Sequence, residues 1–257
     1  MGFVAALFVG ISLGMMGGGG SILTVPVLVY LFGISPVLAT SYSLFIVGTT
    51  SLAGALNSYS KGLVDLRTSL LFGLTSIATV FFIRKLIIPR IPEIITLGKL
   101  DLHFSSVTMV VFAVLMFLAS ISMIRSRPIP EPGTVKSKGK GLLFLYGLGI
   151  GLVTGFLGAG GGFLLIPVLV LWLRLDIKRA VGTSLLIIAL NSLVGFAGDS
   201  GHFDINWTLL LAITAIAIGG VFIGNALSAE IRPQKLKKGF GIFILLVGIY
   251  IIVRELV

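Results

Sequence analysis

Two glycine clusters hold the backbone groups best placed for binding chemistry in this sequence. They occur in the segments MMGGGGS and GAGGGF, and their members are Gly17, Gly18, Gly19 and Gly20, followed by Ser21, and Gly158, Gly160, Gly161 and Gly162. Glycine has no side chain and adopts either sign of φ, so successive N–H groups can turn toward one ligand and form an anion-binding nest. The clusters therefore predict an anion site made of backbone.

A short apolar run containing a proline follows each cluster. Helices that begin near Ser21 and Phe163 would aim their unpaired N–H groups and positive partial charge at the glycines. Pro26 and Pro167 are compatible with helix starts, where a residue needs no N–H partner. We expect the anion to be held without a buried lysine or arginine. Close helix packing is the alternative role for glycine, and it is favoured for glycines spaced four apart.

Hydroxyl and amide side chains of the next predicted helix are candidates for completing this site. They are Ser43, Ser51, Thr183, Ser184, Asn191 and Ser192. Two serine pairs recur at equivalent positions of the two halves of the chain, eight residues apart, which places them roughly on one helical face. Serine and threonine in membrane helices also bond their own backbone or a neighbouring helix, and this alternative stays open for each residue.

The composition excludes several other kinds of protein. Of the 257 residues, 56% are hydrophobic and only 11% are charged, whereas a soluble domain has about 25% charged residues. One polytopic membrane domain, residues 1–257, fits these values. The chain has no cysteine and two histidines, so we expect no metal site, no cofactor, no catalytic residue and no nucleic-acid partner. Charged residues are expected outside the helix centres, with Asp199 as a capping residue.

The chain matches itself at an offset of 141 residues. Residues 10–54 and 151–195 share 17 identities, which include glycines of both clusters and the prolines that follow them. The sequence therefore predicts repeat one at 1–125, a basic proline-rich linker at 126–140, and repeat two at 141–257.

Each repeat predicts the same elements, a Gly-broken pair of short helices and three spanning helices. The short runs, 2–16 with 21–33 and 141–157 with 163–173, cannot singly cross about 30 Å of hydrocarbon, so each pair fits a broken helix or a re-entrant hairpin. Spanning helices are expected at about 35–57, 64–85, 104–125, 176–198, 204–226 and 234–253. The predicted fold class is an all-α polytopic membrane protein.

The basic residues predict its orientation. With the linker in the cytoplasm, 14 of the 19 lysines and arginines lie inside, as the positive-inside rule favours. Both termini then lie outside and the repeats have inverted topology, which is typical of transporters and brings the two clusters together near the midplane. Arg84, Lys85, Arg90 and Lys99 are the discordant group. We expect them in an outside loop, either as a solvated segment contacting headgroups or as an anion funnel.

The stretches GISLGMMGGGGSILTVPVLVYLFGISPVLATSYSL and GLVTGFLGAGGGFLLIPVLVLWLRLDIKRAVGTSL resemble the repeated signature of the sulfite exporter TauE/SafE family, also called the toluenesulfonate uptake permeases. The likeness covers essentially the whole chain. It implies a bacterial-type inner-membrane permease for sulfite, thiosulfate or organosulfonates, with the glycines and prolines of both clusters as the paired motif. Repeat one departs from the pattern, with Ser41-Tyr42-Ser43 where repeat two has Gly182-Thr183-Ser184.

A secondary permease is therefore the predicted function. Its partners would be a small anion and the lipid bilayer, with a proton or a counter-anion as candidate coupling ion. A passive anion channel would share the site, and a non-transporting membrane scaffold would use the glycines for packing alone. We expect Gly161→Leu to abolish transport and to leave the protein folded.

Overall fold

The computed structural model describes residues 1–92, 94–97, 100–125, 140–171, 173, 175–199, 201–227 and 233–256. Most of the predicted linker, residues 126–139, and Lys99 lie outside the described residues. Repeat one contains α1 (Gly2–Met16), the 3₁₀-helix η1 (Gly17–Leu23), α2 (Thr24–Phe32), α3 (Pro36–Ser60), α4 (Leu66–Phe82), the π-helix η2 (Ile83–Ile87), the 3₁₀ turn η3 (Ile88–Arg90), β1 (Ile94–Leu97), β2 (Leu100–His103) and α5 (Phe104–Ile124). Repeat two contains α6 (Lys140–Leu157), α7 (Gly162–Leu171), α8 (Ile177–Gly198), α9 (Trp207–Leu227) and α10 (Pro233–Leu256).

The nearly all-helical fold confirms the predicted class. In the part of the chain that the structure describes, six helical segments are long and apolar enough to cross a membrane. They are Gly2–Phe32, Pro36–Ser60, Leu66–Arg90, Phe104–Ile124, Ile177–Gly198 and Trp207–Leu227. The predicted helix boundaries agree with the observed ones to within a few residues.

The first of these segments is not one straight helix, because the chain reverses direction at the first glycine cluster. A side chain on Gly20 would collide with the backbone N of Leu13, seven residues earlier, although such a separation along a continuous helix is about 10 Å. At the open end, the rings of Phe3 and Phe32 lie 5.5 Å apart. Thus α1 and α2 are the two arms of a helical hairpin with the glycines at its tip.

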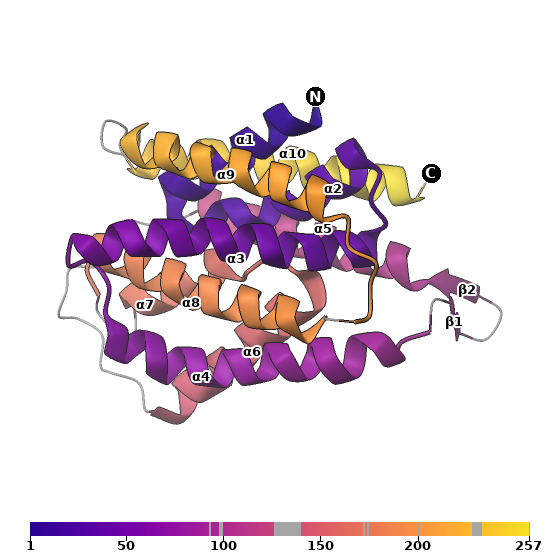
Figure 1. Cartoon of the computed structure of the whole chain (residues 1–257), viewed down its shortest axis with the longest axis horizontal. Coiled ribbons are helices and arrows are strands. Elements are labelled where there is room, and N and C mark those ends of the chain that lie inside the picture. The colour runs from indigo at the N-terminus through magenta and orange to yellow at the C-terminus, as the bar shows by residue number, and fades with distance from the viewer. Residues whose placement is uncertain are drawn as a thin grey trace.

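Helices of repeat one pack against helices of repeat two at equivalent positions. Helix α1 packs against α9 of the other repeat, and α6 packs in the same way against α4; α3 pairs with α8, and α5 with α10. In Figure 1 α3 and α8 run side by side, with α4 along one side of the pair and α9 along the other. Each contact of this kind thus joins one half of the chain to the other. Inversion of the two halves relative to a membrane stays a prediction.

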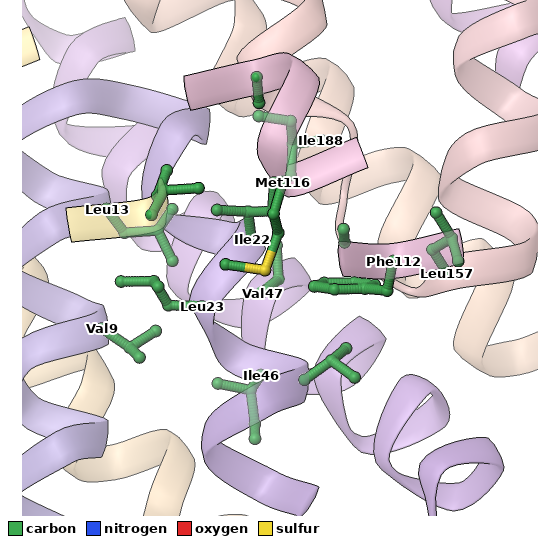
Figure 2. Close-up of a cluster of buried hydrophobic side chains, with 14 of the residues drawn as sticks. Val9, Leu13, Ile22, Leu23, Ile46, Val47, Phe112, Met116, Leu157 and Ile188 are labelled. Atoms are coloured by element: carbon green, nitrogen blue, oxygen red, sulfur yellow. The ribbon is translucent and has the colours of Figure 1, made fainter. Parts of the chain in front are cut away.

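The apolar core joins both repeats around the two glycine clusters. Ile22 in η1, Val47 in α3 and Ile188 in α8 are buried in one cluster, which α5 completes with Phe112 and Met116 (Figure 2). Because side chains of α3 and α8 close over these clusters, the two glycine clusters lie inside the protein.

The segment after α4 differs from the expected loop. Helix α4 continues through η2 and η3, and the strands β1 and β2 then form an antiparallel hairpin in which Ile94 pairs with His103. The hairpin projects beyond the helices in Figure 1. The apolar residues Ile83 and Ile88 are buried. The helical segment therefore extends to Arg90, beyond the end that was predicted at about residue 85.

Candidate functional site

The two glycine clusters are in direct contact. A side chain on Gly18 would collide with the backbone of Gly162, and one on Gly162 would collide with Gly18. Ser21 Oγ donates a hydrogen bond to the carbonyl of Gly18 at 2.7 Å and also bonds the carbonyl of Ala159. At the offset of 141, Gly18 matches Ala159 and Ser21 matches Gly162. The contact between Gly18 and Gly162 and the contact between Ser21 and Ala159 therefore join equivalent positions of the two repeats. The structure thus brings the two clusters together; residues 17–21 are called the first tip and residues 158–162 the second tip.

The backbones of the two clusters are not the same. Gly17 and its equivalent Gly158 both have positive φ, 64° and 67°. After that point the first cluster forms the 3₁₀-helix η1. In the second cluster, Gly160 and Gly161 also have positive φ, 66° and 64°, and form an irregular turn. The second cluster therefore has the more irregular backbone of the two.

The helices after the tips begin close to the predicted positions. Helix α7 begins at Gly162, one residue before Phe163, whereas α2 begins at Thr24, after the 3₁₀ segment. Pro26 is the third residue of α2, where no N–H partner is needed. Pro167 is the sixth residue of α7 and supplies no N–H to the helix at that point.

Three of the predicted polar residues have structural hydrogen bonds. Ser43 Oγ donates to the carbonyl of Gly158 at 2.8 Å, which joins α3 to the second tip. Its equivalent Ser184 donates instead to Val181 in its own helix at 2.8 Å, although its Oγ lies close to Gly17. Thr183 Oγ1 accepts from the N–H of Asp65 at 3.0 Å and so is engaged at the start of α4.

Three other predicted residues are buried with unpartnered polar atoms. These atoms are Ser51 Oγ, Ser192 Oγ and Asn191 Nδ2. Asn191 uses its Oδ1 to accept from Ser76 at 2.9 Å. Ser192 adjoins the second tip, since its Oγ would lie 3.5 Å from a Cβ on Gly160. Buried polar groups in native proteins are almost always bonded, so these free atoms indicate a place where a polar ligand could bind.

Thr154, which was not among the residues predicted from the sequence, also has a buried hydroxyl without a partner. Its Oγ1 would lie 2.7 Å from a Cβ on Gly161. Thr154 precedes Gly158 by one helical turn in α6, and its repeat-one equivalent is Leu13. Because the two residues differ, a comparison of the two repeats for identical residues does not select Thr154. With Ser192, Thr154 gives the second tip two free hydroxyls.

The site is closed in this structure. Residues 17–21 and 158–162 are all buried. A neighbouring cavity lined by Ile22, Phe112, Leu115, Val153, Leu157 and Ala159 is apolar and has no room for a water molecule. The two clusters are therefore not accessible from the surface in this structure.

A buried ion pair contradicts two expectations from the sequence. Arg84 Nη1 lies 3.0 Å from Asp199 Oδ2, and the two side chains are 0% and 1% exposed. The expected outside loop is wrong for Arg84, which lies in η2. Asp199 occupies the C-cap position of α8, as expected, but its side chain is buried and pairs with Arg84. The continuation of α4 turns Arg84 inward against Gly198, where the missing side chain leaves room. The protein therefore does contain a buried arginine.

Comparison with known proteins agrees with the architecture. A family model described as "Sulfite exporter TauE/SafE" matches residues 2–251. The chain is 29% identical to a "Probable membrane transporter protein" of Xylella fastidiosa, with 96% of this chain and 92% of that protein covered. It is 26% identical to "Probable membrane transporter protein YunE" of Bacillus subtilis, with 98% of each covered. No solved structure gives a significant match.

Proposed function

The chain belongs to the sulfite exporter TauE/SafE family of membrane transporters, and we propose that it is a secondary permease for sulfur-containing anions. The substrate class is sulfite, thiosulfate or an organosulfonate. The protein would lie in a bacterial-type inner membrane with its linker in the cytoplasm and both termini outside. A proton or a counter-anion would supply the driving force.

The observation that carries the proposal is the pair Ser51 and Ser192. They occupy equivalent positions in the two repeats, both are completely buried, and neither hydroxyl has a partner. An unbonded buried hydroxyl costs about 1–3 kcal/mol, so two at matched positions favour a ligand over chance. Hydroxyl and amide donors can hold an oxyanion without fixing a full positive charge, and a weakly held anion can leave again.

The geometry around the tips supports binding between the two repeats. The second tip offers positive-φ glycines and the start of α7, where the N–H of Leu164 bonds the carbonyl of Gly161 and the positive end of the helix dipole favours an anion. Thr154 and Ser192 stand beside these glycines. Because the tips come from different repeats, a movement of one repeat against the other would open the site to one side and then to the other, as in other repeat-built transporters.

Transport into proteoliposomes tests the proposal. Purified protein is reconstituted, and uptake of ³⁵S-sulfite and ³⁵S-thiosulfate is measured with and without a proton gradient, with taurine, sulfoacetate, sulfate and chloride as competitors. We expect saturable uptake that one sulfur anion blocks. Flux that never saturates would favour the passive channel. No flux and no anion-induced thermal shift from folded protein would favour the membrane scaffold.

A further inference from the structure

The ion pair of Arg84 and Asp199 leaves most of its hydrogen-bonding capacity unused. Arg84 bonds through Nη1, while Nε and Nη2 have no partner although the side chain is completely buried. The Asp199 carboxylate has a second neighbour besides Arg84, the hydroxyl of Ser41, which is close enough to donate a hydrogen bond to it. The free polar atoms at this buried place are therefore the Nε and Nη2 donors of Arg84.

A purely structural ion pair does not account for these free atoms. Burying two charges is costly, and a buried pair is favourable only when its remaining donors and acceptors are also bonded. Nε and Nη2 form one edge of the planar guanidinium. Two parallel N–H donors on such an edge match two oxygens of a carboxylate, sulfite or sulfonate group. The free edge of Arg84 therefore has the geometry of an oxyanion receptor.

The pair also lies close to the second glycine cluster. Ile83, next to Arg84, packs against Gly155 in the last turns of α6. Thr40, next to Ser41, contacts Gly158 through its backbone. Arg84 and Ser41 are therefore each adjacent in the chain to a residue that contacts the end of α6 or the second tip.

The two repeats differ at this place. At the offset of 141, Arg84 matches Asn225 and Asp199 matches Ser58, so the equivalent positions in the other half are neutral. Asp199 follows the last residue of α8, and Ser41 lies in the second turn of α3. The ion pair therefore lies near the end of the α3–α8 packing at which α3 begins and α8 ends. In the predicted orientation this end faces outside.

We propose that Arg84 binds the transported oxyanion between this end of the protein and the glycine clusters. The Nε and Nη2 edge donates two hydrogen bonds to the anion, and Asp199 holds the guanidinium in place and neutralises it when no anion is present. This inference deepens the proposed permease function and rests on it. It also adds a charged binding residue to a path that otherwise offers neutral donors.

Equilibrium binding of ³⁵S-thiosulfate and ³⁵S-sulfite to detergent-purified protein, with uptake by proteoliposomes, tests this role. The decisive variant is the double substitution Arg84→Gln with Asp199→Asn, which removes both charges and leaves neutral polar groups of similar size. Asp199→Asn alone removes the internal competitor for Arg84. Lys85→Gln is the matched control, because Lys85 is the adjacent residue and is exposed.

We expect the double variant to bind the anion at least about tenfold more weakly than the unaltered protein, while Lys85→Gln binds normally. Asp199→Asn, if it folds, should bind several-fold more tightly. A double variant that binds and transports like the unaltered protein would overturn the role of Arg84 and leave the permease intact. Unaltered protein that binds and transports neither anion would remove the permease proposal, and this inference with it.

Discussion

Ser43 in repeat one donates a 2.8 Å hydrogen bond to the carbonyl of Gly158 in repeat two, 115 residues further along the chain. The equivalent hydroxyl, on Ser184, bonds within its own helix. The two repeats are therefore alike in sequence at this position and different in bonding. The second tip is tied to α3 of repeat one, while Gly17 of the first tip receives no bond from Ser184.

Replacement of Ser43 by alanine should destabilise the protein more than the same change at Ser184. Ser43→Ala removes a bond between the repeats and leaves a buried carbonyl short of a donor, at a cost of about 1–3 kcal/mol. Ser184→Ala removes a bond to its own helix, which contributes little. Thermal unfolding in detergent, followed by circular dichroism, measures both. Equal losses from the two variants would contradict the asymmetry.

Gly18→Ala and Gly19→Ala should have opposite outcomes, although the residues are adjacent. A methyl group at Gly18 would collide with the backbone of Gly162 and with Ile188, whereas at Gly19 it would meet only Met16, at 3.6 Å. Overpacking of this kind costs about 1–3 kcal/mol. Gly18→Ala should lower the unfolding temperature and force the tips apart, and Gly19→Ala should fold normally. A stable Gly18→Ala variant with full transport would show that the contact between the tips is dispensable.

The expected behaviour of Gly161→Leu needs revision in this light. Gly161 has φ of 64°, and its Cβ would lie 2.7 Å from Thr154 Oγ1 and 3.0 Å from Ile150. Leucine there should destabilise the fold as well as block the site. Gly19→Ala is the better probe, because any loss of transport by a folded protein would then come from the cluster itself.

Loss of the free hydroxyls should weaken anion binding without weakening the fold. Ser51→Ala with Ser192→Ala removes two groups that have no protein partner, so the unfolding temperature should stay the same or rise. Binding of ³⁵S-thiosulfate should fall at least about a hundredfold, since each of the two lost bonds to a charged ligand is worth about 1.5–3 kcal/mol. Ser120→Ala, which loses a bond within its own helix, is the control. Undiminished binding by the double variant would exclude these hydroxyls from the site.

Removal of one member of the ion pair should be far more damaging than removal of both. Arg84→Gln leaves the Asp199 carboxylate buried without its cation, which costs about 3–5 kcal/mol. Addition of Asp199→Asn should restore most of that loss. Unfolding temperatures of the single and double variants give the comparison. A single variant as stable as the double would show that the pair interacts weakly.

The predicted orientation can be tested by labelling, because the chain has no cysteine. Lys61 and His202 are both exposed and lie beyond opposite ends of the paired helices α3 and α8. In intact cells, a membrane-impermeant maleimide should label His202→Cys and should label Lys61→Cys only after the membrane is permeabilised. The reverse pattern would place the linker outside.

The sequence alone determined the helices, their order and their duplication. Apolar runs about 20 residues long can satisfy their backbone bonds in lipid only as helices, so their positions follow from local composition. The matched glycines and prolines likewise located both tips, and the family signature is carried by the same residues. These features depend on neighbours in the chain, which a sequence displays directly.

The tertiary structure alone decided which polar groups are free and which charges are buried. Ser51 and Thr183 are both candidates from the sequence, but packing leaves the hydroxyl of Ser51 unpartnered and makes that of Thr183 accept from the N–H of Asp65. Arg84 was expected in water because it is charged, yet it meets Asp199, 115 residues away, inside the protein. Such pairings depend on which helix faces lie together, and no local pattern in the chain specifies that.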